Sequence, residues 1–182
     1  MKKLAICIIA TMLYSISLEA APRDLIVNDT IINDQLIERQ ALVLEIVQSY
    51  APIQTVEDVQ LHLDNPKSPI NKLSLAARDR FVESIVYTEN GVGGFSYLPL
   101  LELPKGDIYQ IAKLFGLQFE LPILDRGTFD KGDKNTFSIL CDGDTDCLGG
   151  DLYDAVCVES SDGSRSCRQL GGHVCSSNCP TN

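Results

Sequence analysis

The sequence predicts a mainly α-helical fold, with a compact body of about four helices followed by a small, disulfide-rich, loop-dominated C-terminal segment. Two observations favour this fold class. Between residues 33 and 116, apolar residues recur at helical spacing, and capping residues and helix breakers bound each run. In residues 141–182, cysteines, glycines and polar residues replace the helical pattern.

The first helix is expected over residues 33–50. Asn33 can act as its N-cap, and Asp34 and Glu38 follow near the positive end of the helix dipole. Apolar residues cover more than half of its circumference, so we expect this helix to be the central element of the core. Its apolar positions are Leu36, Ile37, Ala41, Val43, Leu44, Val47 and Tyr50.

Two shorter helices are expected next. Thr55 and Asp58 have the spacing of a capping box, which predicts a helix over residues 55–63. Ser74 can cap a further helix, and the apolar residues that follow it keep helical spacing over residues 74–87.

Glycines separate the third helix from the fourth. Asn90 and Gly91 are expected to end the third helix in a left-handed turn. Residues 91–104 hold too many glycines for a helix, and their aromatic and branched residues favour a short strand or an ordered loop. The fourth helix is expected over residues 105–115, with Gly116 as its stop signal.

The composition divides the chain into an N-terminal signal, a body, a linker and a C-terminal segment. Residues 1–20 have the charged start, short apolar run and small residues of a secretory signal peptide, with cleavage expected after Ala20. Residues 21–124 form the helical body, which we expect to fold without the C-terminal segment. Residues 125–140 are polar and predict a linker, and residues 141–182 form an acidic, cysteine-rich segment.

Net charge limits the partners. The chain carries a formal charge of -10 at pH 7, which becomes -11 when Lys2, Lys3 and Glu19 leave with the signal peptide. Because phosphate backbones and anionic lipids repel such a chain, we expect neither nucleic acid nor a membrane surface as its partner. The apolar run is shorter than the roughly 20 residues of a membrane helix, so no membrane insertion is expected after cleavage. The prediction is a secreted or periplasmic protein whose partner is an unknown extracellular or periplasmic protein or ligand.

The cysteine content supports export. Cys7 lies within the signal peptide, and six cysteines remain in the C-terminal segment. An even, clustered set in an oxidising compartment predicts three disulfides, although the spacing does not select the pairing. The six residues are Cys141, Cys147, Cys157, Cys167, Cys175 and Cys179.

Residues 141–147 read Cys-Asp-Gly-Asp-Thr-Asp-Cys. This stretch resembles the acidic half of the calcium-binding class A repeat of low-density-lipoprotein receptors. The resemblance implies calcium as a ligand, with side-chain oxygens from Asp142 and Asp146 and the carbonyl oxygen of Asp144 between them.

The rest of that repeat is not present. The acidic positions that close the repeat fall on Leu152 and Tyr153, so Asp151 or Asp154 would have to complete the calcium shell. The alternative is an acidic turn that is clipped by disulfides and hydrated by water. No cofactor is expected apart from calcium, should this loop bind it.

Zinc and catalysis are both disfavoured by the sequence. His173, Cys175 and Cys179 lack the usual Cys-x2-Cys spacing, and thiols of an exported chain tend to oxidise. His62 is the other histidine, and the chain contains neither Gly-x-Ser-x-Gly nor His-Glu-x-x-His. No catalytic residue is therefore assigned.

These observations predict a small, acidic, exported protein that acts by binding and is not an enzyme. Two alternatives remain open. The helical part could be a carrier from which the cysteine-rich peptide is released, with Leu-Gly-Gly at residues 148–150 and 170–172 as cutting sites. The protein could also be an extracellular hydrolase whose site the sequence does not reveal.

Overall fold

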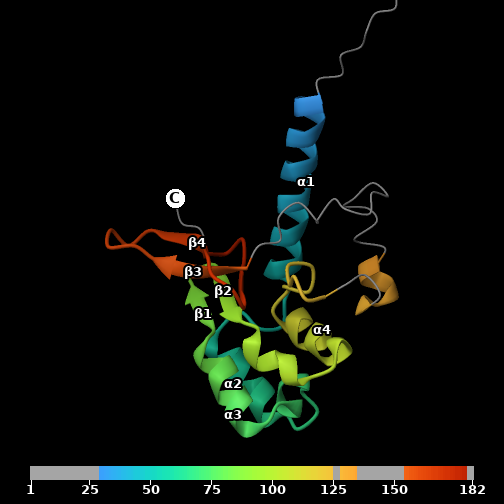
Figure 1. Cartoon of the computed structure of the whole chain (residues 1–182), viewed down its shortest axis with the longest axis vertical. Helices are drawn as coiled ribbons and strands as arrows, with labels where there is room; N and C mark the ends of the chain where they lie inside the picture. The colour runs from blue at the N-terminus through green and yellow to red at the C-terminus, as the bar shows by residue number, and fades with distance from the viewer. Residues whose placement is uncertain (1–28, 125–127, 135–153, 180–182) are drawn as a thin grey trace, which may run out of the picture.

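The computed structural model describes residues 29–124, 128–134 and 154–179, with side chains from residue 38 onward (Figure 1). These ranges contain α-helices, β-strands and short 3-10 helices, and residues 131–134 are helical as well. The helices are α1 (Asp29–Ser49), α2 (Val56–Asp64), α3 (Leu75–Glu83) and α4 (Lys105–Leu114), and the 3-10 helices are η1 (Pro69–Lys72) and η2 (Leu98–Glu102). The strands are β1 (Val86–Thr88), β2 (Gly91–Ser96), β3 (Ala155–Glu159), β4 (Arg165–Gln169) and β5 (His173–Cys175).

The prediction of a mainly α-helical fold with a loop-dominated C-terminal segment is wrong. One antiparallel sheet has the strand order β1-β2-β5, and a second consists of β3 and β4. Strand β5 pairs with β2, which places Val174 opposite Phe95. The C-terminal segment therefore contributes a strand to a sheet of the body. Local sequence patterns do not show this, because the two pairing strands lie far apart in the chain.

Close approach of β5 explains a glycine in β2. Gly94 has φ of +152°, and a Cβ added there would lie 2.3 Å from the carbonyl oxygen of Val174. A larger residue at this position would push the two strands apart.

Helix α1 lies at the edge of the fold, and the prediction that it is the central core element is wrong. It begins at Asp29, so Asn33 lies inside it. Val43, Leu44 and Val47 are partly buried and pack against a small cluster of buried aromatic residues, which are Tyr109, Phe119 and Phe129. The opposite side of the helix is exposed, and α1 projects from the body (Figure 1). From residue 38 onward, its exposed large apolar residues are Leu42, Ile46 and, just beyond the helix, Tyr50.

The capping signals of two helices are confirmed. The Asp58 backbone N–H donates to Thr55 Oγ1 at 3.3 Å, and the Thr55 backbone N–H donates to Asp58 Oδ2 at 3.0 Å. This reciprocal capping box starts α2. At α3, Ser74 Oγ accepts the backbone N–H of Ala77 at 3.3 Å.

Helix α3 ends earlier than the apolar spacing predicts. It stops at Glu83, and residues 86–88 form β1, which turns at Asn90 and Gly91 into β2. Gly91 has φ of +117°, a backbone conformation that suits glycine. The Asn-Gly pair therefore closes a hairpin instead of capping a helix.

The main core lies between the helices and the three-stranded sheet. Phe81, Phe95 and Phe115 meet edge to face, with ring centroids 5.1 to 5.7 Å apart. Val174 of the C-terminal segment belongs to this cluster. None of the helices in the described ranges combines the length and the apolar character that crossing a membrane requires.

Candidate functional site

Two disulfides hold the C-terminal strands together, and they confirm the prediction for these cysteines. Cys157 pairs with Cys179, and Cys167 pairs with Cys175. The sulfur atoms of Cys157, Cys175 and Cys179 lie within 4.8 Å of one another. All three are oxidised, so they offer no thiolate to zinc. Cys141 and Cys147 lie outside the described residues.

Most of the predicted calcium ligands lie outside the described residues as well. These are Asp142, Asp144, Asp146 and Asp151. Asp154 is described, and its Oδ1 accepts a hydrogen bond from the Tyr97 hydroxyl. Burial and this hydrogen bond raise the pKa of Tyr97 to about 12. Asp154 thus anchors the start of β3 to the body.

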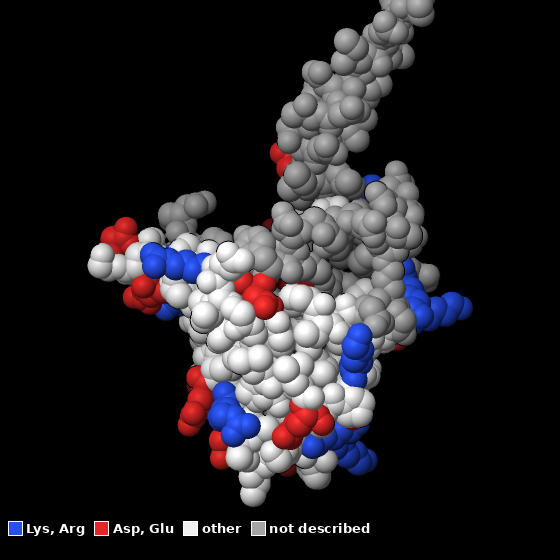
Figure 2. Space-filling view, in the orientation of Figure 1, with Lys and Arg blue, Asp and Glu red and all other residues white. Residues whose placement is uncertain are grey.

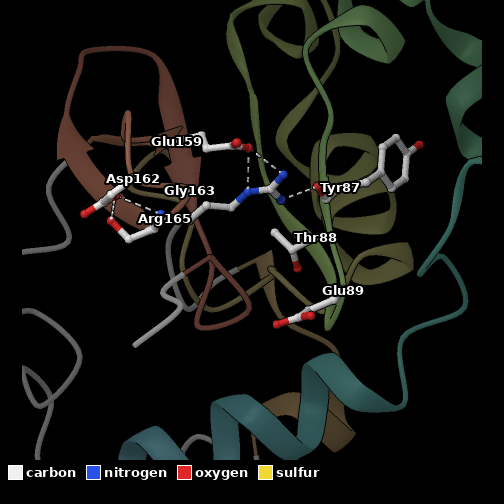
Figure 3. Close-up of a pocket in the computed structure, with 8 residues that line it drawn as sticks. Tyr87, Thr88, Glu89, Glu159, Asp162, Gly163 and Arg165 are labelled. Carbon is white, nitrogen blue, oxygen red and sulfur yellow. Dashed lines mark hydrogen bonds and ion pairs between the residues drawn. The ribbon is translucent and has the colours of Figure 1, made fainter.

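A polar cleft lies between two hairpins (Figure 3). The β1–β2 hairpin forms one wall and the β3–β4 hairpin forms the other, and the volume is about 620 Å³. The lining residues are Tyr87, Thr88, Glu89, Glu159, Asp162, Gly163, Ser164 and Arg165.

Arg165 joins the two walls of the cleft. Its Nη1 donates to the backbone carbonyl of Tyr87 at 2.6 Å. Its Nε and Nη2 both donate to Glu159 Oε2, at 3.2 and 2.9 Å. The guanidinium therefore bridges the β1–β2 hairpin and the β3–β4 hairpin (Figure 3). A planar, multiply donating group is well suited to this bridging role.

Carboxylates dominate the charge of the cleft. Asp162 Oδ1 accepts the Ser164 hydroxyl at 2.6 Å and the Ser164 backbone N–H at 3.0 Å. These hydrogen bonds lower the pKa of Asp162, so this carboxyl is ionised at neutral pH. Glu89 is exposed on the opposite wall. The lining thus contains three carboxylates, from Glu89, Glu159 and Asp162, and one guanidinium, which is paired with Glu159.

Figure 2 shows the surface distribution of these charges. Acidic and basic side chains lie side by side on the projecting β3–β4 hairpin, as the bridged pair of Glu159 and Arg165 requires. The charges on this hairpin are therefore of mixed sign.

The contact between the Ser164 hydroxyl and Asp162 joins residues two apart in the β3–β4 turn, so it is a local side-chain hydrogen bond that shapes the turn. Thr88 Oγ1 lies 3.1 Å from the carbonyl oxygen of Gly91 and 3.0 Å from that of Asn178, so its hydroxyl holds the backbone. Elsewhere in the described ranges, His62 Nδ1 lies 3.3 Å from Ser68 Oγ. Ser68 is only 4% exposed, which denies a substrate access to it.

The sequence contained a signal for this cleft that the prediction of a loop-dominated C-terminal segment missed. Residues 155–159 and 165–169 are two short runs with β-branched or cysteine residues, separated by a stretch that contains Asp162 and Gly163. This pattern is typical of a β-hairpin. In contrast to the hairpin, the contact of Arg165 with Tyr87 is not indicated by any local sequence pattern.

Comparisons of the chain with protein-family models, with curated proteins and with solved structures find no match. The functional assignment therefore depends on the chemistry of the chain's own residues.

Proposed function

We propose that the protein is exported and acts by binding, with the cleft between the two hairpins as the recognition site for a cationic segment of an extracellular or periplasmic partner. The observation that carries this proposal is the carboxylate excess of the cleft, held in place by Arg165 and by the disulfides behind β3 and β4. Rigid placement of charge lowers the ordering cost of binding.

Export is supported by the signal-like residues 1–20 and by the two disulfides, which are typical of oxidising compartments. Binding is favoured over hydrolysis because the Ser164–Asp162 contact of the cleft is a local turn hydrogen bond and because Ser68, next to His62, is buried. The release of a cysteine-rich peptide is disfavoured, because β5 pairs with β2 and would have to leave the sheet.

The cleft proposal predicts a specific loss of affinity for a basic peptide. We expect a fluorescently labelled oligolysine peptide to bind at low ionic strength. The double substitution Glu89→Gln and Asp162→Asn should weaken this binding about threefold to tenfold, because each substitution removes one exposed ion pair with a lysine of the peptide. Fluorescence anisotropy measures the affinity.

A matched control separates the cleft from the total charge. Asp79→Asn with Glu83→Gln removes the same number of charges from exposed positions of α3, and we expect less than about a twofold change. Equal weakening by the two double variants would show that the peptide responds to net charge alone.

The acidic loop is a separate proposal. We expect calcium to bind weakly, in the range of about 10⁻⁴ to 10⁻³ M, because the resemblance provides only part of a ligand set. Calorimetric titration of the wild type and of an Asp142→Asn, Asp146→Asn variant tests this expectation. The same negligible heat from both proteins would identify the loop as purely structural.

A further inference from the structure

Sulfur atoms from two different disulfides lie close together in the C-terminal segment. The Cys167–Cys175 bond is named the outer disulfide here, and the Cys157–Cys179 bond the inner disulfide. The Sγ atom of Cys175 lies within 4.8 Å of both sulfur atoms of the inner disulfide. One sulfur of the outer disulfide is therefore a close neighbour of the inner bond.

The two bonds differ in burial. Cys157 is 5% exposed and Cys179 is 0% exposed, so the folded protein shields the inner disulfide from solvent. Cys167 and Cys175 are both partly exposed. Because exchange with a thiol depends on access to the sulfur atoms, an external thiol meets the outer disulfide first.

The residues around the outer disulfide favour attack at Cys167. Both chain neighbours of Cys167 in β4 are exposed. The chain neighbours of Cys175 are Val174 and Ser176, which are only 3% and 2% exposed. An external thiol therefore has the easier approach to Cys167, and this attack makes Cys175 the leaving thiolate.

Two consecutive glycines of β2 make room for this arrangement. A Cβ added at Gly93 would lie 3.0 Å from the Sγ atom of Cys157, and a Cβ added at Gly94 would lie 3.2 Å from the Cα atom of Cys175. Both disulfides thus pack against the same stretch of β2 backbone, which approaches them closely because it carries no side chains there.

We propose that the two disulfides form a thiol–disulfide exchange site for a small external thiol. The ionised thiol attacks Cys167 Sγ and forms a mixed disulfide there, while the electron pair of the broken bond stays on Cys175 as a thiolate. The Cys175 thiolate then attacks Cys157 or Cys179 and forms a new internal disulfide as the inner bond breaks. The sulfur that leaves takes up the proton that the external thiol released. The products are one mixed disulfide, one internal disulfide and one free thiol, so the reaction needs no other oxidant or reductant.

Peptide mapping of the full-length oxidised protein after exposure to reduced glutathione tests the exchange. Acid stops the reaction, N-ethylmaleimide then blocks free thiols, and tryptic cuts after residues 165 and 168 isolate Cys167 on its own peptide. By mass spectrometry we expect glutathione on Cys167, Cys175 in a new disulfide, and the thiol label on Cys157 or Cys179. Label on Cys175 with the inner disulfide intact, glutathione on Cys175, or no change at these four cysteines would each overturn the proposal.

Two variants test the role of Cys175 directly. Cys167→Ser leaves Cys175 without its partner, and we expect the inner disulfide to exchange in this variant without added thiol. The double variant Cys167→Ser, Cys175→Ser lacks the internal nucleophile, so we expect glutathione to leave its inner disulfide intact. Opening of that bond at the wild-type rate would show direct attack by glutathione and would overturn the proposal.

The wild-type map decides the matter even if a variant fails to fold. The exchange goes beyond the binding function proposed above, and its readout does not involve Glu89 or Asp162. The cleft proposal and the exchange proposal therefore fail separately.

Discussion

Replacing Val174 with aspartate is expected to lower the free energy of unfolding by about 3–5 kcal/mol. Val174 is 3% exposed and faces Phe95 across the β2–β5 pairing. A carboxylate at this position would lose its hydration inside a cluster of aromatic and aliphatic side chains and would gain no cationic partner. Urea denaturation followed by circular dichroism measures the loss.

Leu170→Asp provides the matched control. Leu170 precedes β5 in the same segment but is 48% exposed, so we expect a change of less than about 1 kcal/mol. If both variants were equally stable, β5 would not be part of the core in solution.

The β2–β5 pairing also changes the expectation that residues 21–124 fold without the C-terminal segment. The Ser176 hydroxyl donates to the Val92 carbonyl at 2.6 Å, and the Ser176 backbone N–H donates to the Gly93 carbonyl at 2.9 Å. A chain that ends before β5 would lose these bonds and expose one edge of β2. We therefore no longer expect the helical body to unfold cooperatively without the C-terminal segment.

The second large effect concerns Glu120 and its pH dependence. Desolvation raises the pKa of Glu120 from its ordinary value of 4.5 to about 8, while a hydrogen bond from Gln48 Nε2 opposes the shift. Gln48 Oε1 in turn accepts the Ser177 hydroxyl at 2.6 Å. This chain of polar groups connects the end of α1, the segment after α4 and the C-terminal segment.

The sign of the pH dependence follows from the direction of the shift. Below pH 4.5 the carboxyl is neutral in both the folded and the unfolded chain, so Glu120 costs nothing. As the pH rises towards 8, the unfolded chain releases the proton while the folded protein retains it, and stability falls. Above the folded pKa the penalty is complete.

Glu120→Gln is therefore expected to stabilise the protein at pH 8 by roughly 2–4 kcal/mol and to leave its stability at pH 4 unchanged. The substitution keeps an acceptor for Gln48 and removes only the ionisation. Because the residue retains some solvent contact, we expect less than the full value of the shift. Denaturation of both proteins across pH 4–8 measures the difference, and a difference that does not vary with pH would contradict the assignment.

Local signals in the sequence correctly predicted the starts of α2 and α3 and the end of α4. The Thr55–Asp58 capping box forms within one helical turn, and the cap of α3 at Ser74 reaches only as far as Ala77. Helix α4 ends next to Gly116, which has φ of +71° as a helix stop requires. In each case the hydrogen bond that fixes the structure joins residues a few positions apart.

The cleft could be predicted only in part. The turn around Asp162 and Gly163 indicates the β3–β4 hairpin, and the cysteine content indicates that disulfides brace it. The bridge from Arg165 to Tyr87 could not be predicted, because it joins two hairpins that are distant in the chain.

The sequence by itself determined three features of this protein: the acidic charge, the oxidised state expected of the C-terminal cysteines, and the capped starts of α2 and α3. Tertiary structure alone decided that β5 completes the sheet of the body, that Cys157 pairs with Cys179, and that α1 lies at the edge of the fold. The physical reason is the range of the interactions. Capping and helix periodicity act between neighbours along the chain, whereas strand pairing, disulfide choice and burial depend on which distant surfaces the folded chain brings together.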